Sequence, residues 1–249
     1  MGVVILAFFV TFLAVQCSAN HPVIEVRFIH AISNAPNFSV YFDNTRLYDD
    51  LDFGSVSQYS DVTLGSYDVR LVQENTGQVL FEIRNLTMTD KQTTLIAHGS
   101  LDRQDEFPFA ITKLEDDNDP NRSQARVRMY HAAAGAPDID VLLDSSTLYR
   151  SLDYTELTEY QDIAEGPHVV AVRDTRSGEQ IISPTTIPFD DETIVNLYFA
   201  GTNGATTDRL TMIVAIDIET GIRDFSSSSS ASSLQFAFIV GFLSILAFL

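Results

Sequence analysis

A ten-residue stretch that occurs twice decides how this chain is organised. The segment at residues 27–36 reads RFIHAISNAP, and it returns at residues 128–137 as RMYHAAAGAP. The offset of 101 residues holds without a gap from residue 27 to residue 72, and fifteen of the 46 aligned pairs are identical. The sequence therefore predicts two copies of one structural unit, which we call repeat 1 (residues 20–114) and repeat 2 (residues 125–225).

Both repeats show the periodicity of β-strands. Val26, Phe28 and His30 alternate with Arg27 and Ile29, a period of two that is typical of a strand with one buried face. Turn-forming residues follow at Asp43–Thr45 and Asn75–Gly77 in repeat 1, and at Asp144–Ser146 and Arg176–Gly178 in repeat 2. Roughly seven short strands per repeat favour an all-β protein of two tandem immunoglobulin-like antiparallel β-sandwich domains. An acidic linker at residues 115–124 is expected to join them.

The start of the chain is typical of a secretory signal peptide over residues 1–19. Residues 3–15 are apolar, and small residues precede a cleavage site after Ala19. A retained membrane anchor is the alternative, but it would need roughly 20 apolar residues. Cleavage would also remove Cys17, the only cysteine, so the mature extracellular chain is expected to fold without disulfide bonds.

The end of the chain is typical of a glycosylphosphatidylinositol (GPI) signal over residues 226–249. A serine-rich segment begins at Ser226, and residues 234–249 carry no charge. We expect the anchor at Ser226, Ser227 or Ser228, after removal of the hydrophobic tail. The anchor would then attach the protein to its expected membrane partner, on the extracellular face of the plasma membrane.

The charge balance narrows the classes of partner. The chain carries 34 acidic and 15 basic residues, which gives a formal net charge of −19. Such a surface repels phosphate backbones, so we expect no nucleic-acid partner. Solubility alone accounts for this acidity, and binding of cations is the alternative interpretation.

The sequence predicts no enzyme and no catalytic residue. A G-x-S-x-G elbow, an S-x-x-K pair and a phosphate-binding glycine loop are absent from the sequence. His30 and His131 recur at the same place in both repeats, on the inward row of the first strand. We interpret them as structural, with a neutral imidazole bonded to the Ala-Pro turn, although a duplicated functional site would give the same pattern.

Three sequons predict N-glycosylation, at Asn37, Asn85 and Asn121. Asn121, in the polar linker, is the strongest of the three by position. Asn37 is the weakest, because it lies beside Pro36 at the entry of a core strand.

The linker is also the strongest candidate metal site. Asp116, Asp117 and Asp119 place three carboxylates within four residues, and Ca²⁺ takes six to eight oxygen ligands. A solvated, self-repelling spacer is the alternative. No other cofactor is expected.

The repeated stretch also resembles a known family. The pattern of His30-Ala31, Ala35-Pro36 and Val40, repeated at His131-Ala132, Ala136-Pro137 and Val141, is similar to the secreted repeats catalogued as domain of unknown function 4397. The likeness covers roughly residues 24–114 and 125–218. Repeat 2 is closer, with Asp138–Val141 where repeat 1 has Asn37–Val40. The resemblance implies extracellular β-sandwich modules on surface-attached proteins, and it supplies no catalytic residues.

Together these features predict a GPI-anchored surface glycoprotein that acts in adhesion or ligand binding, with other surface proteins or glycans as partners. An acidic, protective coat protein is the alternative. Adhesion requires an exposed apolar or strand-edge patch. The outward-row candidates for such a patch are Ile29, Tyr41, Tyr130 and Leu142.

Overall fold

The computed structural model describes residues 22–89, 91–101, 106–117, 119–203, 209–218 and 221–228. The predicted signal peptide and the hydrophobic tail lie outside these residues. Within them, no helix has the length and apolar character needed to cross a membrane.

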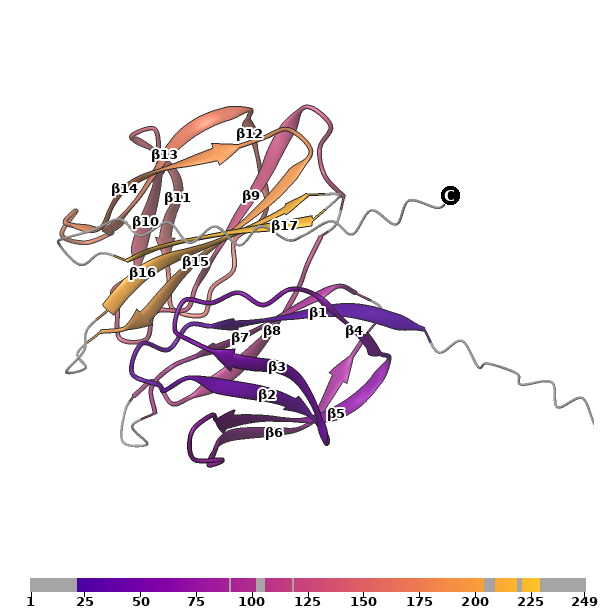
Figure 1. Cartoon of the computed structure of the whole chain (residues 1–249). Coiled ribbons are helices and arrows are strands. Elements are labelled where there is room, and N and C mark those ends of the chain that lie inside the picture. Colours follow the sequence, from indigo (N-terminus) through magenta and orange to yellow (C-terminus); the bar gives the residue numbers. More distant parts are fainter. Residues whose placement is uncertain are drawn as a thin grey trace, which may run out of the picture.

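Repeat 1 folds into two four-stranded sheets that pack face to face (Figure 1). Its inner sheet, which lies toward repeat 2, has the order β4-β1-β7-β8, and its outer sheet has the order β3-β2-β5-β6. The strands are β1 (Val23–His30), β2 (Phe38–Phe42), β3 (Thr45–Leu51), β4 (Ser60–Thr63), β5 (Gly65–Gln73), β6 (Val79–Met88), β7 (Thr93–His98) and β8 (Ala110–Glu115).

Repeat 2 has the same arrangement with one further strand (Figure 1). Its inner sheet has the order β12-β9-β15-β16-β17, and its outer sheet has the order β11-β10-β13-β14. The strands are β9 (Gln124–His131), β10 (Ile139–Leu143), β11 (Ser146–Leu152), β12 (Gln161–Ala164), β13 (Gly166–Asp174), β14 (Gln180–Phe189), β15 (Thr193–Thr202), β16 (Arg209–Ile218) and β17 (Gly221–Ser228). The predicted all-β fold of two sandwiches is therefore confirmed.

The sheets differ from the expectation in one respect, because each inner sheet contains a parallel pair. β1 pairs with β7 in parallel, from Val26 opposite Thr93 to His30 opposite Ala97, and β9 pairs with β15 in the same way. The remaining strand pairs are antiparallel. A parallel pair needs a long crossover, and the crossover from β1 to β7 passes through the whole outer sheet.

Each sandwich has its own hydrophobic core, formed by the inward rows that the alternation predicted. Val26 and Phe28 are fully buried in the core of repeat 1, and Val127 and Met129 take the same places in repeat 2. The predicted hairpin turns are present as well. Gly77 and Gly178 adopt φ values of 67° and 71°, a left-handed conformation that glycine tolerates without strain.

Candidate functional site at the interface between the repeats

A third hydrophobic cluster lies between the repeats, where the two inner sheets face each other. Ile29 on β1 and Tyr130 on β9 belong to it and are 0% and 1% exposed. Both were outward-row candidates for an exposed patch, and neither is exposed, because the opposite repeat covers them. The other buried members are Ala31, Val56, Ile96, Leu114, Ala132, Tyr198, Ala200, Ile213 and Ala215.

The contact between the repeats is pseudo-symmetric. Ala31 corresponds to Ala132, and Leu114 corresponds to Ala215, by the same offset of 101 residues that relates Ile29 to Tyr130. Both members of each pair lie in the interface. This is the geometry of an isologous contact, in which two copies of one surface meet each other.

A network of polar side chains lies beside this apolar cluster, and Arg27 is its member on β1. The guanidinium of Arg27 is fully buried, and its Nε donates to Thr94 Oγ1 at 2.7 Å. Its Nη1 donates to Asp217 Oδ1 of repeat 2 at 2.7 Å. The group also lies over the ring of Tyr59, 4.6 Å from the ring centroid. Burial opposes the cation, but Asp217 and the neighbouring Tyr198 hold the pKa of Arg27 well above its ordinary value.

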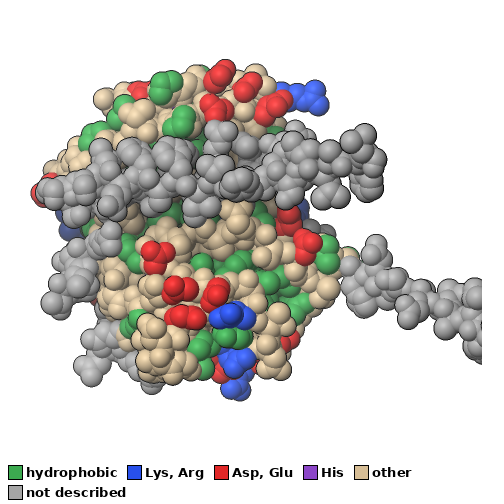
Figure 2. Space-filling view, in the orientation of Figure 1, with side chains coloured by type: hydrophobic (Ala, Val, Ile, Leu, Met, Phe, Trp, Pro, Cys, Tyr) green, Lys and Arg blue, Asp and Glu red, His purple; other side chains and the backbone are tan. Residues whose placement is uncertain are grey.

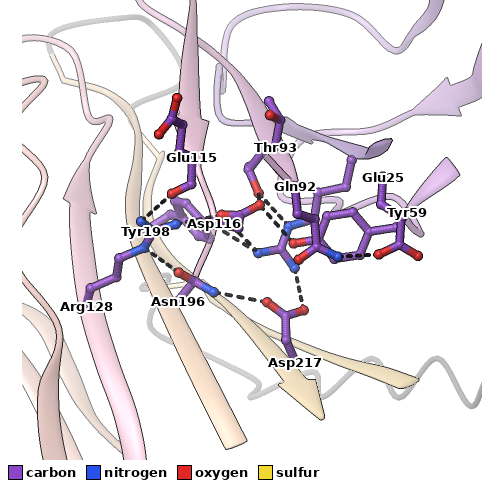
Figure 3. A network of polar contacts seen from close by, with 12 residues as sticks. Glu25, Tyr59, Gln92, Thr93, Glu115, Asp116, Arg128, Asn196, Tyr198 and Asp217 are labelled. Carbon is purple, nitrogen blue, oxygen red and sulfur yellow. Dashed lines mark hydrogen bonds and ion pairs between the residues drawn. The ribbon is translucent and has the colours of Figure 1, made fainter. Parts of the chain in front are cut away.

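Arg128 is the equivalent residue on β9, and it repeats these contacts. Its Nε donates to Asn196 Oδ1 at 2.6 Å, and the guanidinium lies 4.7 Å from the ring centroid of Tyr160. Its Nη2 donates to Asp116 Oδ1 at 2.6 Å. Figure 3 shows Arg128 reaching both Asp116, which directly follows the last strand of repeat 1, and Asn196 of repeat 2.

The two ion pairs are exchanged between the repeats. Asp116 and Asp217 stand 101 residues apart, so they are equivalent positions. Arg27 of repeat 1 pairs with Asp217 near the end of β16, and Arg128 of repeat 2 pairs with Asp116, which directly follows β8. Asn196 Nδ2 also donates to Asp217 Oδ2 at 3.1 Å, which links the two halves of the network (Figure 3).

Burial gives these pairs their energetic weight. Desolvation raises the pKa of Asp217, against the opposing effect of Arg27. Removing one member of a buried pair leaves an uncompensated charge and typically destabilises a protein by about 3–5 kcal/mol. The network therefore favours this relative orientation of the repeats, because both arginines have their buried carboxylate partners in it.

The opposite side of the interface is aromatic and carries a buried histidine. His98 on β7 contacts Tyr154 of repeat 2, with 2.6 Å between His98 Nδ1 and Tyr154 Oη. Its Nε2 lies 2.8 Å from Thr112 Oγ1. Burial lowers the pKa of His98 to about 4, so the imidazole is neutral at physiological pH. Sequence reasoning passed over this residue, since repeat 2 has no histidine at the corresponding place.

The duplicated histidines are buried at the end of the first strand of each repeat. His131 Nδ1 accepts a hydrogen bond from the Ala133 amide at 3.3 Å, and its Nε2 donates to the Pro137 carbonyl at 3.2 Å. This confirms the structural role predicted for His131. His30 is also buried, and its ring stacks on Phe38 at 4.3 Å between centroids.

Two of the three linker carboxylates predicted as a calcium site, those of Asp116 and Asp117, are paired with arginines. Asp116 is 8% exposed, and besides Arg128 it accepts hydrogen bonds from Tyr59 and Thr94. Asp117 pairs with Arg126 at 2.8 Å. Asp119 accepts a bond from the same arginine through its backbone carbonyl. Among the described residues, no group of three or more acidic, histidine or cysteine side chains is placed to hold a metal ion, and calcium at the linker stays a prediction.

The predicted modification sites lie in three surroundings. Asn37 and Asn85 are exposed: Asn37 directly precedes β2, and Asn85 lies within β6, an edge strand of the outer sheet of repeat 1. Asn121 is half-buried, and its amide donates to Gln124 and Asp162 at 3.2 Å. The backbone of Ser226–Ser228 pairs with β16 as the end of β17. Glycosylation and anchoring at these positions stay predictions.

The comparison with known proteins returns one family. A protein-family model described as "Domain of unknown function (DUF4397)" matches residues 24–141 and, a second time, residues 125–224. The two matches overlap at the start of repeat 2. No curated protein matches the chain.

Proposed function

The chain belongs to the DUF4397 family, and from that premise, together with the interface between its repeats, we propose that it is a non-enzymatic adhesion or ligand-binding module of the cell surface. Its chain would enter the secretory pathway and be glycosylated at Asn37, Asn85 and Asn121. A GPI anchor at Ser226, Ser227 or Ser228 would hold it on the extracellular face of the plasma membrane. Other surface proteins or glycans would be its ligands.

The fixed docking of the two repeats is the observation that supports this proposal. The duplicated polar residues Arg27, Arg128, Asp116 and Asp217 bond to one another, so they serve the architecture of the unit. With the inner sheets buried against each other, the outer sheets face away from the junction (Figure 1). A rigid unit presents these faces at a constant geometry. Many copies anchored in one plane then gain avidity from weak individual contacts.

The test uses the chain from Asn20 to Ser228, which contains every described strand, coupled to beads through its C-terminus. We expect beads to clump with one another or to bind cells. A failure to do either at high surface density would contradict the proposal and favour the acidic coat. Repeating the assay in calcium and in chelator tests the linker separately, because clumping lost in chelator would support a calcium site at Asp116, Asp117 and Asp119.

The anchor has its own assay. Treatment of expressing cells with a phosphatidylinositol-specific phospholipase is expected to release the protein into the medium. Retention on the cells after treatment would contradict the anchor without bearing on adhesion.

A further inference from the structure

The outer sheets of the two repeats have the same strand order but differ in the charge of one row of residues. In repeat 1, one row crosses the sheet through Arg46 on β3, Tyr41 on β2, Arg70 on β5 and Glu82 on β6, each paired with the next. Asp68 lies beside this row on β5. Figure 2 shows basic and acidic side chains close together on the lower half of the molecule, where repeat 1 lies.

The charges of this row take part in local contacts. Arg46 pairs with Asp49 at 2.8 Å and lies 3.7 Å from Glu74. The Arg70 guanidinium lies over the ring of Tyr41, 5.7 Å from its centroid. The outer face of repeat 1 therefore carries an ion-paired surface along this row.

The equivalent row in repeat 2 carries no charge. By the offset of 101 residues, Arg46 becomes Thr147, Tyr41 becomes Leu142, and Arg70 becomes Ala171. Leu142 pairs with both of the others across β11, β10 and β13. Asp68 and Glu82 are replaced in the same way, by Val169 and Ser183.

The side chains of this second row point away from the core. Val141 on β10 and Val170 on β13 are fully buried in the core of repeat 2. The alternation of the strands places Leu142, Val169 and Ala171 on the opposite face. Val169 is 38% exposed and Leu142 is half-buried, whereas Ala171 is 8% exposed between its neighbours on this face. We call the set Leu142, Thr147, Val169, Ala171 and Ser183 the neutral face.

The net charge of the chain indicates which binding partner fits the neutral face. The whole chain carries −19, so two copies repel each other across most orientations. The five residues of the neutral face carry no charge, so two identical molecules can meet on them without placing like charges from these residues opposite each other. The nearest ion pair, Asp140 with Arg173 at 2.8 Å, is internally neutralised, and the Asp140 side chain is buried. A strongly charged partner would gain nothing from such a face.

We propose that the neutral face binds the neutral face of a second copy of this chain. Two outer sheets of repeat 2 pack face to face about a two-fold axis, as sheets do in a sandwich. The inference deepens the proposed function and rests on it, because it makes the adhesive contact homophilic and places it in repeat 2. Repeat 1 then faces away from the contact with its sequons free.

The test transplants the row of repeat 1 onto repeat 2. The triple variant Leu142→Tyr, Thr147→Arg and Ala171→Arg introduces only residues that the same backbone positions carry in repeat 1, so the fold is expected to persist. The reverse exchange in repeat 1, Tyr41→Leu, Arg46→Thr and Arg70→Ala, is the matched control. Sedimentation equilibrium of the Asn20–Ser228 chain over a concentration series gives the dimer constant, and a thermal melt checks that each variant is folded.

We expect the wild type to dimerise, and the repeat 2 variant to dimerise at least about tenfold more weakly, because it sets arginines opposite arginines. The control should keep the dimer. Added salt should strengthen wild-type association, since it screens the net repulsion of the two acidic chains. A wild type that stays monomeric over the whole series would overturn the inference. So would a folded repeat 2 variant that dimerises as well as the wild type.

The bead assay separates this inference from the proposed function. Clumping that persists in the folded repeat 2 variant would overturn the role of the neutral face and leave adhesion standing. Wild-type beads that bind cells without clumping one another would also overturn the homophilic contact, and would point to a foreign ligand. Beads that do neither would count against adhesion itself.

Discussion

Acidification should lower the free energy of unfolding of this protein by protonating its buried histidines, and the effect can be measured at His98. Burial lowers the pKa of His98 from 6.5 to about 4 in the folded chain, while an unfolded chain keeps the ordinary value. Each pKa unit corresponds to about 1.4 kcal/mol, so full protonation of His98 removes about 3 kcal/mol from the free energy of unfolding.

The sign follows from which state binds the proton. The folded pKa lies below the unfolded one, so the stability that His98 supports is complete above pH 6.5 and declines as the pH falls to about 4. Below that pH the contribution has gone. Because His98 contacts Tyr154 of repeat 2, its protonation should act on the junction between the repeats.

Urea denaturation of wild type and His98→Gln at about pH 7.5 and about pH 4 isolates this effect, because the surface carboxylates titrate alike in both proteins and cancel in the difference. We expect the wild type to lose about 3 kcal/mol more than the variant over this range. His168→Gln is the control of opposite sign: desolvation lowers the pKa of His168, but the hydrogen bonds to Asp144 and to the Ala164 carbonyl, together with the charge of Asp144, raise it by more. A difference between wild type and His98→Gln that stays constant with pH would refute the reasoning.

Three further predictions concern the junction and the turns. In a double-mutant cycle of Asp116→Asn and Arg128→Met, each single change should lower the free energy of unfolding by about 3–5 kcal/mol and the pair by less than the sum, as urea denaturation would show; additive losses would contradict the buried pair. Tyr130→Ala should lower stability by about 3–5 kcal/mol in the same assay, and a loss within about 0.5 kcal/mol would mean that the repeats do not bury this ring. Gly99→Ala should lower the melting temperature more than Gly77→Ala does, because its new Cβ would lie 2.3 Å from a backbone carbonyl oxygen, whereas Gly77 has open space; equal shifts would contradict that crowding.

The duplication made much of the fold predictable. The alternation of Val26 and Phe28 with Arg27 gave the inward row of β1, and the Asn75–Gly77 turn marked the hairpin between β5 and β6. Such local patterns determine which residues face the core. They also placed His131 in a structural role, which its bond to the Pro137 carbonyl confirms.

The interface between the repeats could not be predicted in the same way. The sequence pattern around an outward apolar residue such as Ile29 is the same whether solvent, a ligand or another repeat covers the side chain. Asp116 was interpreted through its acidic neighbours in the linker, although its partner Arg128 lies on the following strand of repeat 2. The usable signal was the recurrence of Arg27 as Arg128 and of Asp116 as Asp217, because a charged residue kept twice on an apolar strand implies a buried partner.

Joining the two copies of the repeat in one chain removes a constraint that identical subunits place on an isologous contact. In a dimer of identical subunits, every substitution appears on both sides of the axis at once. The new side chain must therefore be compatible with its own copy across the axis as well as with its neighbours. A tandem chain is free of that condition. The residue equivalent to Ile29 in repeat 2 is Tyr130, and the residue equivalent to Phe53 is Tyr154. The hydroxyl of Tyr154 contacts His98, and this contact exists on one side of the junction only. The same freedom lets one copy of the sandwich keep a charged row across its outer sheet while the equivalent row of the other copy carries no charge, a difference that a symmetric pair cannot have.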